Sequence, residues 1–387
     1  MWTYDEAAEA YYFHHFYKHQ PDLNISNPAV RDEICRIMGY WLQLGVSGFR
    51  VDAAPYLINQ PGTGEALREF REFLSWRQGD AILLTETNVA PSEMAGYFAD
   101  GVHLMLNFWV NQHVALALAR NDPTPLREAL DRTPLPPSTG QYANFLRNHD
   151  ELNLSQLSEE ERAEVYREFA PDENMRIFDR GIRRRMATML NGDQARIRLA
   201  YSLMFSLPGT PVLRYGEEIG MGEDLSLSGR ESVRTAMQWC DAPNGGFSTA
   251  PPEWLLRPAI AEGEFAYQEV NVIKQSRDSD SLLNWMEQLI RLRKECPELG
   301  HGACRLLKAM DQRVFAHRCD WRDGSIIAVH NLSDRPASWR APEEENASLI
   351  EIWGGTIHRR FENGTPVELP PFGYRWFRVT GPGRKPA

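Results

Sequence analysis

Three carboxylates in this sequence each follow a short apolar stretch, and their placement is the first indication of chemistry. Asp52 follows GFRV, Glu86 follows AILLT, and Asp150 ends ANFLRNHD. Retaining cleavage of a glycosidic bond requires two carboxyl groups about 5 Å apart, one as nucleophile and one as general acid and base. Because adjacent strands lie roughly 4.8 Å apart, neighbouring strand ends can supply such a pair.

Arg50 accompanies Asp52 on the same predicted strand. Side chains alternate along a strand, so Arg50 and Asp52 are expected on one face. A close guanidinium favours the ionised carboxylate that a nucleophile needs, while the Leu- and Ile-rich run before Glu86 favours a protonated acid. An Arg-x-Asp pair alone fits a structural ion pair equally well, and His149 alone fits a structural histidine. Three carboxylates on three separate strand ends favour catalysis.

Composition and charge limit the possible classes of function. The chain has 387 residues, of which 42% are hydrophobic and 25% are charged, and its net charge is −11. These values are typical of a globular protein with two or three domains, and the negative charge argues against a nucleic-acid partner. The basic run at residues 180–185 (RGIRRR) is expected to be a solvated helix face.

The cysteines and the N-terminal residues bear on the compartment. Five cysteines are an odd number without a CxxC pair, which predicts free thiols in a reducing compartment rather than disulfides or a zinc site. MWTYDEAAEA lacks the basic and apolar segments of a signal peptide, and no run approaches the ~20 apolar residues of a membrane span. We therefore expect a cytoplasmic protein with no membrane partner.

Short apolar strands alternate with helical stretches over residues 27 to 295, which predicts a parallel sheet with right-handed crossovers. Polar or charged residues end the strands, as in a (β/α)₈ barrel. A Rossmann-type sheet is the competing architecture, but no G-x-G-x-x-G follows any strand. The predicted helices cover 28–44, 62–78, a short stretch after Pro91, 193–206 and 280–294. The predicted strands cover 48–53, 81–87, 103–109, 143–150 and 210–218.

The last ninety residues change in character. RVFAHRCDW, SIIAVHNLS, ASLIEIWGG and GYRWFRV are short strand-like runs separated by turn residues. This pattern predicts a small antiparallel β-sandwich. The expected domains are part of a catalytic barrel at 1–297, the β-sandwich at 298–380 and a disordered tail at 381–387.

The motifs GFRVDA, LLTE and RNHD resemble those of the α-amylase superfamily (glycoside hydrolase family 13). QPDLN at 20–24 is similar to the marker of its oligo-1,6-glucosidase branch. The resemblance is closest to the trehalose synthases, through HQPDLNISNPAVRDE, GIRRRMATML, SLPGTPVLRYGEEIGMGEDLSL, VRTAMQW and LPPFGYRWF. It covers nearly the whole chain.

The resemblance implies a role for each catalytic carboxylate. Asp52 would be the nucleophile, Glu86 the general acid and base, and Asp150 would bind sugar hydroxyls and stabilise the distorted ring. Some aromatic side chains would stack on the substrate, because sugar C–H faces pack on rings.

By the same resemblance, Arg50 and His149 would complete the glucose pocket, and Arg234 of VRTAMQW would reach the nucleophile and the substrate. No cofactor is implied, and a structural calcium stays open. The implied partners are small α-glucosides, maltose and trehalose, and the oligomeric state is open.

The implied activity is isomerisation of maltose to trehalose through a covalent glucosyl-enzyme. Two alternatives within the enzymes are a hydrolytic α-glucosidase and another transglucosidase of the oligo-1,6-glucosidase branch. Outside the enzymes, the alternatives are a non-catalytic accessory protein and an inactive truncated fragment.

The sequence departs from the family pattern in three places. It begins after the family's first three βα units, so about five of the eight barrel strands are expected. Asn88-Val89-Ala90 stands where trehalose synthases tend to have Asn-Gln-Trp, and LNFWV at 106–110 lacks an expected histidine. The last two differences lie on the side of the pocket that binds the leaving sugar.

Overall fold

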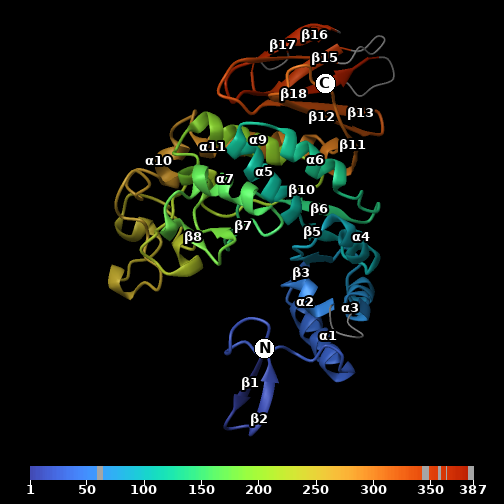
Figure 1. Cartoon of the computed structure of the whole chain (residues 1–387), viewed down its shortest axis with the longest axis vertical. Helices are drawn as coiled ribbons and strands as arrows, with labels where there is room; N and C mark the ends of the chain where they lie inside the picture. Colours follow the sequence, from blue (N-terminus) through green and yellow to red (C-terminus); the bar gives the residue numbers. More distant parts are fainter. Residues whose placement is uncertain (59–63, 342–347, 356–358, 363, 382–387) are drawn as a thin grey trace. The chain divides into compact units, whose positions relative to one another are not determined.

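The computed structural model describes residues 1–58, 64–341, 348–355, 359–362 and 364–381 (Figure 1). Its contacts divide the chain into two compact units. Unit 1 comprises Met1–Leu106 and Pro134–Tyr142, and unit 2 comprises Asn107–Thr133 and Ala143–Ala387. Within the described ranges, every helix is too short or too polar to cross a membrane. Of the expected disordered tail, residues 382–387 lie outside the described residues.

Unit 1 begins with an antiparallel hairpin and continues as alternating helices and parallel strands. Its elements are β1 (Trp2–Asp5), β2 (Ala10–Phe13), α1 (Pro28–Gln43), β3 (Gly48–Val51), α2 (Ala54–Ile58), α3 (Gly64–Arg77), β4 (Ile82–Thr85), α4 (Pro91–Ala99) and β5 (Leu104–Leu106). Strand β4 pairs with β3 on one side and with β5 on the other, both in parallel. This order confirms the predicted alternation of strands and helices.

Local sequence signals account for the boundaries of the first helix and strand. The Asn27 side chain accepts a hydrogen bond from the backbone of Ala29 at 3.0 Å, and Pro28 follows in the first turn of α1, which is the expected start of a helix. Gly45, with φ of +96°, ends it. Strand β3 then begins at Gly48, where a Cβ atom would lie 2.3 Å from the Ile82 carbonyl oxygen of β4. Only glycine permits that approach.

The first part of unit 2 contains helices, one short parallel strand pair and a small antiparallel sheet. Its first elements are α5 (Phe108–Arg120), α6 (Thr124–Arg132), the end of β6 (Gln141–Asn144), β7 (Leu152–Asn153), α7 (Glu159–Phe169), β8 (Arg176–Ile177), β9 (Gly181–Ile182), α8 (Met186–Met189), α9 (Gln194–Ser206), β10 (Thr210–Pro211), α10 (Val272–Ser276), α11 (Leu282–Glu295) and α12 (Glu298–His301). Short 3₁₀ helices occupy Glu173–Met175, Glu217–Ile219, Gly229–Val233, Pro243–Gly246 and Pro252–Trp254. The last two residues of β6 pair in parallel with β10.

All five predicted strands extend beyond the observed ones, and three of them do so by the largest margins. The strand at 103–109 stops at Leu106, because the Asn107 side chain accepts from the backbone of Val110 at 3.1 Å and starts α5. The strand at 143–150 stops at Asn144, and Asn148 accepts from the backbone of Asp150 at 2.9 Å in a turn. The strand at 210–218 stops at Pro211, although Val212 N–H still donates to the Asn144 carbonyl of β6 at 2.7 Å.

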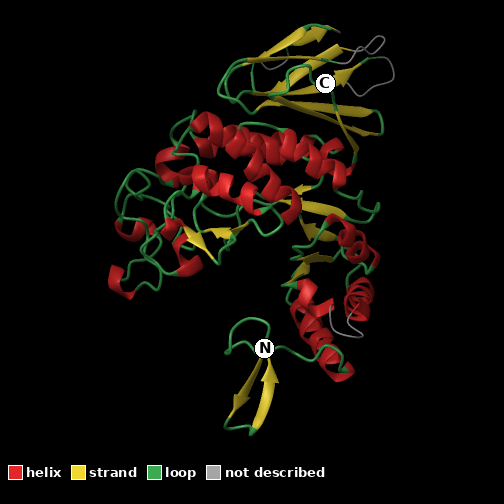
Figure 2. Cartoon of the chain, in the orientation of Figure 1, coloured by secondary structure: helices red, strands yellow, loops and turns green. Residues whose placement is uncertain are grey.

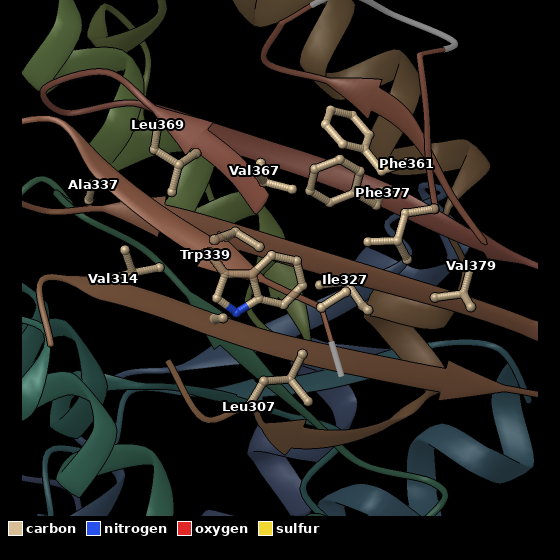
Figure 3. Packing of buried hydrophobic residues seen from close by; sticks show 14 residues of the cluster. Leu307, Val314, Ile327, Ala337, Trp339, Phe361, Val367, Leu369, Phe377 and Val379 are labelled. Carbon is tan, nitrogen blue, oxygen red and sulfur yellow. The ribbon is translucent and has the colours of Figure 1, made fainter. Parts of the chain in front are cut away.

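The C-terminal part of unit 2 is the expected antiparallel β structure, drawn as a group of yellow strands in Figure 2. One sheet has the order β11-β12-β13-β18-β15-β16, and β14 pairs with β17 in a second. The strands are β11 (Ala303–Leu306), β12 (Val314–Trp321), β13 (Gly324–Asn331), β14 (Ala337–Arg340), β15 (Ser348–Trp353), β16 (Arg360–Glu362), β17 (Pro366–Leu369) and β18 (Tyr374–Thr380). Between the two sheets lies a hydrophobic core in which Trp339 stacks against Phe377, with ring centroids 6.3 Å apart (Figure 3).

The opposite face of the six-stranded sheet packs on helices, so β12 and β13 are buried on both faces. His317 bonds the Ser206 carbonyl at the end of α9 at 2.8 Å, and His330 contacts the Ser202 hydroxyl at 3.1 Å. The Arg378 guanidinium donates to the buried carboxylate of Glu298 at 2.6 Å. Buried polar contacts thus join the sheet to α9 and α12.

Candidate active-site residues

The adjacent parallel strands β3 and β4 position three of the candidate residues. Asp52 directly follows β3, and Glu86 directly follows β4. Arg50 donates from one nitrogen to Asp52 Oδ1 at 2.6 Å and from the other to Glu86 Oε2 at 2.8 Å. The first contact confirms that Arg50 and Asp52 share a face. One guanidinium therefore holds both carboxylates, a bridge that the sequence did not predict.

The backbone fixes the two strand ends to one another. Glu86 N–H donates to the Val51 carbonyl at 3.0 Å, and Ala54 N–H donates to the Glu86 carbonyl at 3.1 Å. Between Asp52 and α2, Ala53 adopts a left-handed conformation with φ of +45°. Such a conformation in a residue with a Cβ is uncommon and often marks a functional site. The turn that follows Asp52 is thus defined by the main chain.

The two carboxylates differ in their access to solvent. The Asp52 side chain is 71% exposed, whereas that of Glu86 is 18% exposed. An accessible carboxylate beside a guanidinium suits a nucleophile. The same guanidinium contacts Glu86 and favours its ionised form too, so the protonated acid expected from the apolar run before Glu86 stays a prediction.

A cavity of about 520 Å³ in unit 1 contains Asp52 and Arg50 in its lining, together with residues that the sequence analysis did not select. Among them, His15 Nδ1 bonds the Asp22 carboxylate, and the rings of His15 and Tyr56 lie 5.0 Å apart. Asp22 lies within QPDLN, so the motif itself carried the signal for this residue. His15 and Tyr56 had no comparable signal.

In unit 2, two guanidinium groups converge on Asp150. Arg234 donates to Asp150 Oδ1 at 2.6 Å and to the His149 carbonyl at 2.7 Å. Arg230 lies 3.3 Å from the same Oδ1 and donates to Glu151 at 2.7 Å. His149 Nε2 lies 3.8 Å from Asp150 Oδ2. Unit 2 thus brings together His149, Asp150 and Arg234, and adds Arg230, which the sequence analysis missed.

Buried arginines hold the loop that carries Asp150. Arg147 donates to the Asp150 carbonyl at 2.8 Å, and Arg214 donates to the Asn148 carbonyl at 3.0 Å. Burial lowers the pKa of Arg214 to about 10, and the nearby Arg185 adds to the shift. The loop after β6 does not pair with another strand here, so these side chains supply the hydrogen bonds that its carbonyls require.

The basic run at 180–185 is also structural, and the expectation of a solvated helix face is wrong. Arg183 donates to the carbonyls of Leu225 and Leu227, at 2.7 and 2.6 Å. Arg185 is buried and donates to the Glu217 carboxylate at 3.2 Å. The run contains β9 and ends at Arg185, the residue before α8, and the guanidiniums of Arg183 and Arg185 bond protein carbonyls and a carboxylate.

The six predicted residues therefore form two groups: Arg50, Asp52 and Glu86 in unit 1, and His149, Asp150 and Arg234 in unit 2. Within the described ranges, no three His, Cys, Asp or Glu side chains are arranged to hold a metal ion.

Comparisons with known proteins give the same family for most of the chain. Residues 1–302 match the family model described as alpha amylase, catalytic domain, and residues 324–378 match the one described as sucrose hydrolase-like, C-terminal domain. A trehalose synthase of Thermus thermophilus is 40% identical over 98% of this chain. A trehalose synthase of Pimelobacter sp. (strain R48) is 37% identical, also over 98%.

The chain is shorter than these relatives, since it spans 41% of the Thermus thermophilus protein and 71% of the Pimelobacter protein. Among solved structures, an α-amylase from H. orenii has a TM-score of 0.75 and 23% identity, over 98% of this chain and 70% of that one. The likeness confirms the expected fold class, a TIM-barrel catalytic domain with a C-terminal β domain.

Proposed function

Because this chain belongs to the α-amylase family, we propose that it transfers a glucosyl unit from small α-glucosides with retention of configuration, and that it isomerises maltose to trehalose. The observation that carries the proposal is the bridge from Arg50 to Asp52 and Glu86 at two adjacent strand ends. It provides the paired carboxyl groups that retaining transfer requires.

In the first half of the reaction, the Asp52 carboxylate attacks the anomeric carbon of the non-reducing glucose of maltose. Glu86 gives its proton to the glycosidic oxygen, so that glucose leaves as an alcohol and a glucosyl ester on Asp52 remains. Arg50 stabilises the Asp52 carboxylate before attack. The configuration at the anomeric carbon is inverted once.

In the second half, the Glu86 carboxylate takes the proton from the anomeric hydroxyl of the retained glucose. The oxygen attacks the glucosyl ester, Asp52 leaves as a carboxylate, and the second inversion restores the α-configuration. Asp150 accepts hydrogen bonds from sugar hydroxyls, and His149, Arg234 and Arg230 complete this recognition. No cofactor takes part in these steps.

Isomerisation is favoured by the names of the two relatives, both trehalose synthases. Hydrolysis of the same glucosyl-enzyme is the second candidate. The 71% exposure of the Asp52 side chain favours it, because water reaches the ester as readily as a sugar does.

The finer organisation is also proposed. Strands β3, β4, β5, β6 and β10 correspond to the C-terminal strands of a (β/α)₈ barrel, within a catalytic domain at 1–297, and the β domain covers 298–380. The protein acts in the cytoplasm, which agrees with free thiols at all five cysteines.

The test is product analysis after incubation of the purified protein with maltose. Trehalose as the main product supports isomerisation. Two glucoses per maltose would instead support hydrolysis and contradict isomerisation. If maltose, trehalose and 4-nitrophenyl α-D-glucoside all remain intact with folded protein, glucosyl transfer is refuted.

A further inference from the structure

Two of the free thiols lie directly opposite one another on neighbouring strands of the C-terminal sheet. In the register of the antiparallel strands β11 and β12, Cys304 pairs with Cys319, and both residues are free cysteines. Neither belongs to the two groups of candidate active-site residues. Glucosyl transfer therefore does not account for the pair, and its chemistry can be considered by itself.

The hydrogen bonds of this ladder place the two cysteines at a position that suits a disulfide. Leu307 N–H donates to the Ala316 carbonyl at 2.9 Å, which makes these two residues a hydrogen-bonded pair. The two kinds of pair alternate along an antiparallel ladder, so Cys304 and Cys319 form a non-hydrogen-bonded pair. Opposite residues of that kind have Cα atoms about 4.5 Å apart, within the roughly 4.4–6.8 Å that a disulfide spans.

The two sulfur atoms are already in contact in the reduced protein. The Cys319 thiol forms a hydrogen bond with Cys304, and this bond together with burial raises the pKa of Cys319 well above its ordinary value. A hydrogen bond that raises the pKa of a thiol stabilises its protonated form, so Cys319 is the donor and the Cys304 sulfur is the acceptor. The fold thus holds each sulfur within reach of the other.

The two cysteines differ in their access to solvent. Cys304 is partly exposed, on a strand that pairs with β12 alone within the described part of the sheet, whereas Cys319 is buried. A small dissolved oxidant therefore reaches Cys304 first. The Arg293 guanidinium of α11 opposes the rise in the pKa of Cys319, and its Nε atom is buried without a hydrogen-bond partner among the described residues. This cation favours the Cys319 thiolate, which is the reactive form.

We propose that Cys304 and Cys319 form a reversible disulfide when the protein is exposed to hydrogen peroxide, and that this bond fixes strand β11 to β12. In the first step, the Cys304 sulfur attacks a peroxide oxygen, the O–O bond breaks, water leaves and Cys304 becomes a sulfenic acid. In the second step, the Cys319 sulfur attacks the Cys304 sulfur, the S–O bond breaks and a second water leaves with the Cys319 proton. Hydrogen peroxide accepts the two electrons that the thiols lose.

The disulfide would act on the end of the β11–β12 hairpin that has the fewest supports. At the other end, Arg127 of α6 donates to the carbonyls of Leu307 and Val314, at 3.3 and 2.6 Å. The side chains of β11 alternate between exposed and half-buried, so little apolar packing holds this strand. A bond from Cys304 to Cys319 closes the loop of residues 305–318 and restricts its unfolding. A reducing compartment returns both thiols, which makes the change reversible.

The test locates the linkage in the purified full chain after treatment with hydrogen peroxide and alkylation of the remaining thiols. Trypsin releases Cys304 within residues 295–305 and Cys319 within residues 319–322. In the wild type, we expect these two peptides to be joined and the number of alkylated thiols to fall from five to three. Treatment with dithiothreitol before alkylation should separate the peptides and restore all five thiols.

Variants assign the partner of Cys319, because Cys296 lies in the same tryptic peptide as Cys304. Cys304→Ser should lower the yield of the joined peptides at least about tenfold, whereas Cys296→Ser should leave it unchanged. Cys35→Ser is the matched control, since Cys35 is also partly exposed and is the single cysteine of α1. A linkage that survives Cys304→Ser would overturn the proposal.

One digestion keeps the assignment decisive if a variant does not fold. Cleavage of the oxidised wild type after Glu298 separates Cys296 from Cys304, so the fragment that stays joined to Cys319 identifies its partner. A joined fragment that contains Cys296 refutes the pair. Oxidation of Cys304 to a sulfinic acid without any linkage refutes it as well.

Hydrogen exchange tests whether the bond fixes the strand. The backbone amides of β11 should exchange at least about tenfold more slowly in the oxidised than in the reduced wild type, because the linked strand opens less often. Reduction should restore the faster exchange, and peroxide treatment of Cys304→Ser should leave the exchange of β11 unchanged. Equal exchange of β11 in the oxidised and reduced wild type would contradict the proposed effect on the strand.

Discussion

Arg50 shows how far single residues can be predicted. Alternation along one strand was enough to predict that Arg50 and Asp52 share a face, and their 2.6 Å contact confirms it. The contact from Arg50 to Glu86 depends on the register of two strands, in which Arg50 lies opposite Leu84. Arg230 reaches Asp150 from a 3₁₀ helix far along the chain. Register and loop path have no signature in a single sequence.

The residue-scale prediction concerns Asp52. Asp52→Asn removes the nucleophile and keeps its shape, so we expect kcat for 4-nitrophenyl α-D-glucoside to fall at least about 1,000-fold, or ~4 kcal/mol in the barrier. Because the side chain is 71% exposed, the urea midpoint should stay within the range of ordinary surface substitutions.

Initial rates test the predicted fall in kcat, and urea unfolding of the same preparation tests the predicted stability. Asp80→Asn is the control, since Asp80 is exposed and belongs to neither group of candidate active-site residues. Activity of Asp52→Asn within tenfold of the wild type would contradict the assignment of the nucleophile.

At the scale of elements, capping signals mark the starts of α1 and α9, which were predicted, whereas α6 and α7 were missed even though α7 begins with a capping box. Helix α9 begins after Asp193, whose side chain accepts from the backbone of Ala195 at 2.9 Å, and α1 begins after Asn27. Helix α5 was missed because it is buried on nearly every face, so its sequence has no polar stripe. Predicted strands ran too long where an asparagine side chain started a helix or a turn.

The element-scale prediction concerns the start of α7. Ser158 accepts from the backbone of Glu161 at 3.2 Å, and the Glu161 side chain accepts from the backbone of Ser158 at 3.0 Å, which forms a capping box. Ser158→Ala should lower the free energy of unfolding by about 1 kcal/mol. Urea unfolding measures the change.

Ser92→Ala is the matched control, because Ser92 is exposed in the first turn of α4 and is not its N-cap. We expect a change within about 0.5 kcal/mol there. Equal effects of the two substitutions would show that the capping box of α7 contributes nothing.

At the scale of the whole molecule, the sequence predicted two kinds of structure along the chain, and a C-terminal β domain follows the catalytic part as expected. It did not predict how that sheet joins the helices of unit 2, because the joining residues are isolated polar ones within apolar strands. His317 and His330 are examples, on neighbouring strands and with rings stacked 6.4 Å apart. A buried histidine in a sequence looks the same as an exposed one.

The whole-molecule prediction is a loss of stability in acid. Burial lowers the pKa of His317 from 6.5 to about 4 and places that of His330 well below 6.5. Well above pH 6.5, both histidines are neutral in the folded and in the unfolded state, and their full contribution to stability is present. As the pH falls towards 4, the unfolded state binds protons that the folded state cannot, so stability falls. From pH 7 to pH 5, His317 alone accounts for about 2 kcal/mol.

Urea unfolding of the wild type and His317→Gln at the two pH values checks this, because Gln can keep the bond to the Ser206 carbonyl without titrating. The variant should lose less stability than the wild type by about 2 kcal/mol. His19→Gln, at an exposed ring, should leave the pH dependence unchanged. Identical pH dependence in all three proteins would contradict a neutral, buried His317.

The left-handed backbone at Ala53 has a consequence for how this position can evolve. Relieving the Cβ contact with glycine gains about 1–2 kcal/mol in the folded state, and the greater freedom of glycine in the unfolded chain removes about 0.4–1 kcal/mol. The first effect is the larger, so the exchange should raise the free energy of unfolding by about 1 kcal/mol. Selection for heat tolerance alone would therefore favour glycine. Selection for turnover, which depends on how firmly the neighbouring Asp52 is held, is the force that would keep alanine here.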